Sequence, residues 1–126
     1  MQRELMLGLA LAGSIGAASA QDAASGEAAF KKCQVCHDVG EGARNKLGPI
    51  LNGLDGRKAG TVEGYNYSEA NKSSDIIWSE ATFKEYLIDP SEKMPGTKMM
   101  YSNKNEQEND DLWAYLKQFG SDGKKK

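Results

Sequence analysis

The chain has 126 residues, with 16 lysines and arginines against 18 aspartates and glutamates and a formal net charge of −2. That balance gives no support for nucleic-acid binding, which needs a basic surface. Only 39% of the residues are hydrophobic, and a chain of this length builds a marginal core. The composition therefore suits one domain folded around a buried cofactor.

The first twenty residues are predicted to be a secretory signal peptide that is removed. The apolar run from Leu5 to Ala18 is too short to span a bilayer, and Ala18-Ser19-Ala20 forms an A-x-A cleavage site. Cleavage leaves a single domain of residues 21–126. The weakly charged start Met1-Gln2-Arg3-Glu4 leaves a retained N-terminal anchor as the alternative. We expect a soluble, monomeric, periplasmic protein without membrane insertion.

The first predicted helix follows this segment and is expected to end near His37. Asp22 and Ser25 are its candidate N-caps. Apolar and small residues recur at steps of three, four and three, which places them on one helical face. These positions are Ala23, Gly26, Phe30 and Cys33.

Cys33-Gln34-Val35-Cys36-His37 contains both cysteines and the only histidine. C-x-x-C-H is typical of covalent attachment of a c-type haem, because two thiols on one turn can reach both vinyl groups while the histidine lies beneath the iron. A thioredoxin-like dithiol belongs beside a βαβ pattern, a zinc site needs about four ligands, and a disulfide leaves His37 unexplained. We predict one haem c bound through Cys33 and Cys36, with His37 as an iron ligand. Attachment outside the cytoplasmic membrane agrees with export.

Residues 38–66 show little periodicity and contain seven glycines. A loop this long is unusual unless it is functional or wraps around something, and the haem is the candidate. Gly48-Pro49 is a rigid turn that presents Ile50 and Leu51 to the interior.

Two further helical segments are expected in the middle of the chain. Ser68 to Lys72 can form one turn, and Ser79 is a suitable N-cap for a longer helix. Asp89-Pro90 should end that helix, since the residue before proline avoids the α region. A loop with Pro95-Gly96 follows. The buried face of the longer helix comprises Phe83, Tyr86 and Leu87.

The last predicted helix begins at Asn105, with Glu108 completing a capping-box-like pair, and ends before Gly120. A flexible polar tail is expected after about residue 120. The fold class is therefore all-α, with three main helices, short turns and long loops around one haem. The apolar face of this last helix comprises Leu112, Tyr115, Leu116 and Phe119.

A single histidine excludes bis-histidine ligation within one chain. The sixth ligand is then Met, Lys, an N-terminal amine, water or nothing. Met94, Met99 and Met100 lie in one late loop, and a thioether ligand favours ferrous iron and raises the reduction potential. Filling gaps in the core is the other role open to these methionines.

The sequence resembles the class I c-type cytochromes, the family of mitochondrial cytochrome c and bacterial cytochrome c2, from about Gly26 to Phe119. This resemblance implies the cytochrome c fold around one covalent haem. It rests on the C-x-x-C-H motif and on Gly48-Pro49, Gly56-Arg57, Tyr67, Ala70-Asn71-Lys72, Trp78, Tyr86-Leu87 and Pro95-Gly96-Thr97-Lys98-Met99.

The resemblance implies that Met99, rather than Met94 or Met100, is the second iron ligand. It also implies that the Pro49 carbonyl accepts a hydrogen bond from the ring of His37, which fixes the tautomer and makes the ligand more basic.

The same resemblance implies a polar lining for the haem. Tyr86 corresponds to the tyrosine that bonds the methionine sulfur, and Thr97 to a propionate partner. A buried carboxylate is costly without partners, so fixed donors around the propionates are expected. The residues that match partners of the propionates or of a nearby buried water are Arg57, Tyr67, Asn71 and Trp78.

The function implied is a one-electron carrier, not an enzyme. Quinol–cytochrome c oxidoreductase is the expected donor, with a dehydrogenase as another; a terminal oxidase or a photosynthetic reaction centre is the expected acceptor. A c-type haem enzyme or gas sensor with a labile sixth ligand is the alternative, and a non-haem module would follow only if the protein lacked covalent haem. Tyr101 replaces the usual phenylalanine beside the haem edge. The basic rim is reduced to Lys32, Lys46, Lys93 and Lys98.

Overall fold

The computed structural model describes residues 21–126, so the predicted signal peptide lies outside the described residues. This part of the chain is helical, with long loops and no β-strand. Its elements are α1 (Ala23–Ala29), the 3₁₀ helix η1 (Phe30–Lys32), α2 (Glu69–Lys72), α3 (Glu80–Ile88), α4 (Pro90–Lys93) and α5 (Glu106–Leu116). The all-α class is confirmed for these residues, and none of their helices has the length and apolar character that a bilayer crossing needs.

α1 is shorter than expected. Asp22 caps it by accepting from the Ala24 N–H at 3.0 Å. The chain then tightens into η1, whose i→i+3 bonding places fewer residues in each turn than an α-helix does. The His37 N–H still donates to the Cys33 carbonyl at 2.8 Å, so the haem motif forms its own helical turn.

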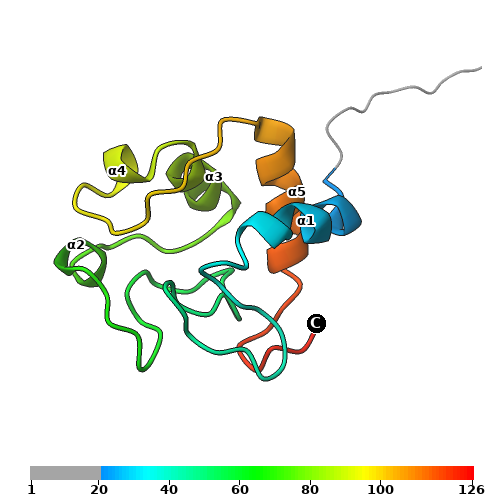
Figure 1. The fold of residues 1–126 in the computed structure, drawn as a ribbon, viewed down its shortest axis with the longest axis horizontal. Coiled ribbons are helices and arrows are strands. Elements are labelled where there is room, and N and C mark those ends of the chain that lie inside the picture. The colour runs from blue at the N-terminus through cyan, green and yellow to red at the C-terminus, as the bar shows by residue number, and fades with distance from the viewer. Residues whose placement is uncertain (1–20) are drawn as a thin grey trace, which may run out of the picture.

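α1 and α5 cross at close range, one from each end of the described chain (Figure 1). Gly26 makes this approach possible, since a Cβ atom there would lie 1.9 Å from the Asp111 carbonyl oxygen. Beside the crossing, the rings of Phe30 and Tyr115 pack with centroids 5.6 Å apart. Phe30 and Leu112 are almost fully buried, so the crossing forms one side of the core.

α3 begins and ends where the sequence predicts, but its continuation differs. Ser79 caps it and forms a reciprocal capping box with Thr82. After Asp89, the chain starts a second short helix, α4, which was not predicted. Proline suits the first position of a helix because it has no N–H to leave unpaired. Asp89 is the N-cap of α4, and its side chain accepts from the Glu92 N–H.

α5 begins after Asn105, which accepts from the Glu108 N–H as expected. The predicted reciprocal bond from Glu108 is wrong, because its carboxylate instead accepts from Lys32 Nζ at 2.6 Å and from the Asn103 amide. The helix stops at Leu116, earlier than predicted, with a cap at Lys117.

Residues 118–126, here named the C-terminal hairpin, fold back on the body although a flexible tail was expected. The Gly120 N–H donates to the Lys124 carbonyl at 2.9 Å, and the Lys126 N–H donates to the Gln118 carbonyl at 2.8 Å. The hairpin lies beside the first part of the long loop 38–66 (Figure 1). That loop contains no helix, in agreement with the sequence.

Candidate haem site

A cavity of about 570 Å³ lies between the Cys33–His37 turn, the long loop, α3 and the segment after α4. Its apolar surface comes from side chains such as Leu51, Leu54 and Phe83. The structure brings all eleven predicted site residues to this cavity. They are Cys33, Cys36, His37, Pro49, Arg57, Tyr67, Asn71, Trp78, Tyr86, Thr97 and Met99.

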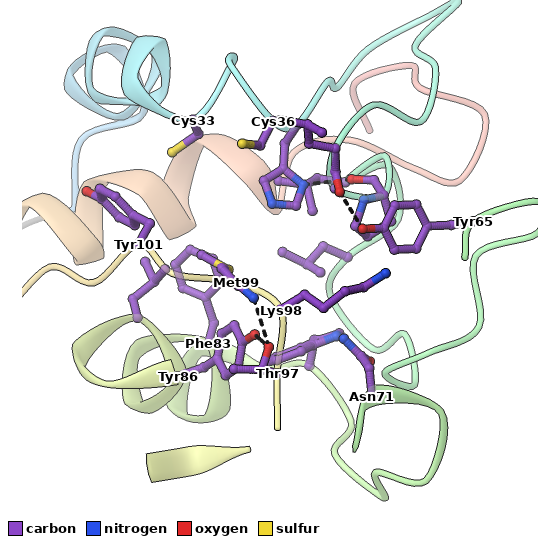
Figure 2. Close-up of a pocket in the computed structure, with 18 of the residues that line it drawn as sticks. Cys33, Cys36, Tyr65, Asn71, Phe83, Tyr86, Thr97, Lys98, Met99 and Tyr101 are labelled. Carbon is purple, nitrogen blue, oxygen red and sulfur yellow. Dashed lines mark hydrogen bonds between the residues drawn. The ribbon is translucent and has the colours of Figure 1, made fainter. Parts of the chain in front are cut away.

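The two cysteines lie side by side on one face of the cavity (Figure 2). Both thiols are free, so the Cys33–Cys36 disulfide does not form. Burial raises the pKa of the Cys33 thiol to about 11. At neutral pH the unmodified polypeptide therefore carries a protonated thiol here, pointing into the space a porphyrin edge would fill.

His37 is held by the carbonyl of Pro49, with Nδ1 and the oxygen 2.7 Å apart. A carbonyl only accepts, so Nδ1 carries the proton and Nε2 keeps its lone pair for a metal. Burial lowers the pKa of His37, and the positive charges of Arg57 and Lys46 lower it further. The neutral imidazole that iron requires is thus favoured in the folded chain.

Arg57 contributes a positive charge to the lining of the cavity. Its Nη1 donates to the carbonyls of Asn52, at 2.8 Å, and Ile50, at 3.1 Å. Its Nε is buried without a hydrogen-bond partner, and so is the Oδ1 atom of Asn71. Buried polar atoms rarely stay unpaired, and a haem propionate with an associated water would satisfy both. These residues therefore fit haem.

Tyr67 and Trp78 complete the polar lining. The Tyr67 hydroxyl accepts from the Val62 N–H at 2.9 Å, so its own proton remains available to a second partner. The indole of Trp78 packs edge-on against Tyr86, with centroids 5.2 Å apart. The backbone N–H of Trp78 donates to the Arg57 carbonyl at 2.9 Å, which ties two propionate candidates together.

The three methionines outside the first twenty residues are separated by their environments. Met94 is 4% exposed and packs in the core, away from the cavity, and Met100 is 86% exposed. Met99 lines the cavity and lies across it from Cys33 and Cys36 (Figure 2). Of the three, Met99 alone combines partial burial with a place at the cavity.

Tyr86 and Thr97 pair with each other, with their hydroxyl oxygens 2.6 Å apart. The Met99 N–H also donates to the Thr97 hydroxyl, at 3.3 Å, which holds the backbone at Met99. Because one hydroxyl proton is used within the pair, one remains for a sulfur or a propionate.

At the mouth of the cavity lie Tyr65, which was not predicted, and Lys98, which was predicted only as part of the basic rim. The Tyr65 hydroxyl donates to the Leu47 carbonyl, and Lys98 Nζ donates to the Asn66 carbonyl at 2.7 Å while lying 5.6 Å from the Tyr65 ring centroid. These two hydrogen bonds join residues that are 18 and 32 positions apart in the sequence, so no local pattern indicates them.

Comparison with known proteins agrees with this site. The family model described as Cytochrome c matches residues 23–120. A cytochrome c2 from Rhodoplanes tepidamans is 63% identical over 107 residues, covering 84% of this chain and 100% of that protein. A cytochrome c2 from Blastochloris viridis is 58% identical over 126 residues, covering 98% and 99%. Among solved structures, cytochrome c2 from Rhodospirillum centenum superposes with a TM-score of 0.75 at 40% identity, covering 79% and 98%.

Proposed function

Because the chain belongs to the cytochrome c family and carries one haem c, we propose that it is a soluble periplasmic electron carrier in which His37 and Met99 would ligate the haem iron. The position of Met99 carries this proposal, since its side chain faces the cavity from the side opposite the two cysteines (Figure 2). Export rests on the signal peptide predicted for residues 1–20.

Bound haem c supplies an iron that alternates between the ferrous and ferric states and so takes up and releases one electron. His37 and Met99 would serve as ligands in both states, so the rearrangement on electron transfer would be small. Pro49 orients His37 and raises the basicity of its imidazole, and the thioether of Met99 favours the ferrous state. Thr97 holds the backbone at Met99.

The polar lining is proposed to hold the haem propionates. The unpaired Nε of Arg57 supports this, because a guanidinium and a carboxylate form strong charge-assisted hydrogen bonds. Tyr67 and Trp78 also line the cavity, and Asn71 is suited to a nearby water. Thr97 and Tyr86 share one hydroxyl proton in the hydrogen bond between them, so the other hydroxyl proton is available to a sulfur or a propionate.

The working surface is proposed to be the mouth of the cavity. Leu47 is 74% exposed and Met100 is 86% exposed, and both line the cavity at its mouth. Lys32 and Lys98 add positive charge, although Lys32 is paired with Glu108. Quinol–cytochrome c oxidoreductase or a dehydrogenase as donor, and a terminal oxidase or photosynthetic reaction centre as acceptor, are the partners proposed for this surface.

Two spectra test the proposal. The haemochrome spectrum of the denatured protein should show thioether-bound haem. Carbon monoxide added to the reduced protein should leave the spectrum unchanged, because Met99 occupies the sixth position, and should give a complex at once in Met99→Ala. A complex formed at once by the wild-type protein would favour the alternative, a haem enzyme or gas sensor with a labile sixth ligand.

A further inference from the structure

Arg57 is hydrogen-bonded to the backbone of Asn52, a residue that does not line the cavity. Its Nη1 makes the shorter of its two hydrogen bonds, 2.8 Å, to the carbonyl of Asn52. Asn52 is 9% exposed and does not line the cavity. The direction in which the unpaired Nε of Arg57 points therefore depends on where the Asn52 backbone lies.

The side chain of Asn52 fixes that backbone through a two-bond contact with Gly40. Its Oδ1 accepts from the Gly40 N–H at 2.8 Å, and its Nδ2 donates to the Gly40 carbonyl at 3.0 Å. Both polar ends of the amide are used, so the side chain has one preferred orientation.

The C-terminal hairpin supports both partners of this contact. The Gly53 N–H, next to Asn52, donates to the Phe119 carbonyl at 3.1 Å. Gly123 lies against Gly40 so closely that a Cβ atom there would be 2.3 Å from the Gly40 carbonyl oxygen. The last residues of the chain thus pack behind the loop that carries Asn52 (Figure 1).

We propose that Asn52 is a positioning residue for Arg57, and that the C-terminal hairpin holds Asn52 in place for this role. The inference rests on the proposed contact between Arg57 and a haem propionate. A guanidinium fixed beside the propionate stabilises its ionised form, and its positive charge disfavours the more positive ferric iron. When Arg57 is free to move, the reduction potential falls and the propionate ionises at higher pH.

The test is the reduction potential of the haem-loaded protein measured as a function of pH. Asn52→Ala should lower the potential at neutral pH and move its pH-dependent step to higher pH. Gly123→Ala changes no charge and no cavity residue. It should shift the potential and the pH-dependent step in the same directions as Asn52→Ala, but by smaller amounts. The matched control is Asn103→Ala, since the side chain of Asn103 also bonds the backbone, accepting from the Asn105 N–H at 3.0 Å, but Asn103 lies in the segment just before α5. It should lower stability and leave the pH-dependent step in place.

Coupling to Arg57 separates positioning from a structural role. If Asn52 acts through Arg57, the shift in Asn52→Ala/Arg57→Lys should be no larger than that in Arg57→Lys alone. Additive shifts in the double variant would overturn the positioning role of Asn52. So would a pH-dependent step that stays at its wild-type position in Asn52→Ala but moves in Arg57→Lys. Either result would leave the propionate contact of Arg57 standing. An unmoved step in Arg57→Lys would overturn the propionate contact itself, and the inference with it.

Discussion

Gly48→Ala should displace the proximal histidine without straining the backbone. A Cβ atom at Gly48 would lie 2.4 Å from Cε1 of His37 and 2.8 Å from both ring nitrogens. Gly48 does not have a positive φ, so alanine is acceptable to its backbone. The steric effect on the imidazole is therefore isolated.

The size of the effect follows from that overlap. Carbon atoms pack at about 3.5 Å or more, so the ring must move by about 1 Å. The Nδ1–Pro49 bond, 2.7 Å long, leaves hydrogen-bonding range if the ring moves away by that amount. Losing it costs about 1–3 kcal/mol. A less basic imidazole stabilises ferric iron less, so the potential should rise, by about 60 mV for each 1.4 kcal/mol of differential stabilisation lost.

Voltammetry and guanidinium unfolding of the haem-loaded protein measure the two effects. Gly42→Ala is the control, because Gly42 has a φ of 76° and nothing lies within 4 Å of its Cβ position. It should lower stability by about 1–2 kcal/mol through backbone strain, at an unchanged potential. A wild-type potential in Gly48→Ala, with no greater loss of stability than in Gly42→Ala, would refute the reasoning.

Three other predictions follow from the same structure. Met99→Ala should abolish the sulfur-to-iron charge-transfer band and lower the potential, whereas Met100→Ala should retain both, because Met100 is 86% exposed; the opposite pattern would reverse the ligand assignment. Gly26→Ala should destabilise the protein by about 1–3 kcal/mol in guanidinium unfolding by forcing α1 from α5, while Glu27→Ala on the same helix should cost much less. Burial raises the pKa of Tyr115, so the folded state keeps the hydroxyl proton to a higher pH than the unfolded state does, and stability should fall as the pH rises above about 10. Tyr115→Phe should reduce this fall in the unfolding midpoints. An unchanged pH dependence in that variant would contradict the prediction.

Local chemistry explains which elements could be predicted. Ser79 and Asn105 start their helices because a short polar side chain satisfies a free N–H of the first turn, and this signal is contained in four residues. α4 was not predicted because Pro90 was interpreted only as the end of α3, although proline also suits the start of a helix.

The site was predictable to the extent that its residues belong to a motif. The C-x-x-C-H turn is contiguous, and the resemblance to a known family indicated the polar lining. Asn52 and the C-terminal hairpin were missed because their contacts join residues far apart, such as Gly40 with Gly123. A single sequence contains no period or cap that records such a pairing.

The crossing of α1 and α5 also determines when this chain can fold. The Asp22 N–H donates to the Asp111 carboxylate at 3.0 Å, across a sequence separation of 89 residues. Closing a flexible loop of that length costs about 4 kcal/mol by its length-dependent part alone. A chain emerging from its N-terminus cannot make this contact until almost all of it is available. The chain therefore folds late in its synthesis, because α1 cannot pack against α5 until α5 has been made.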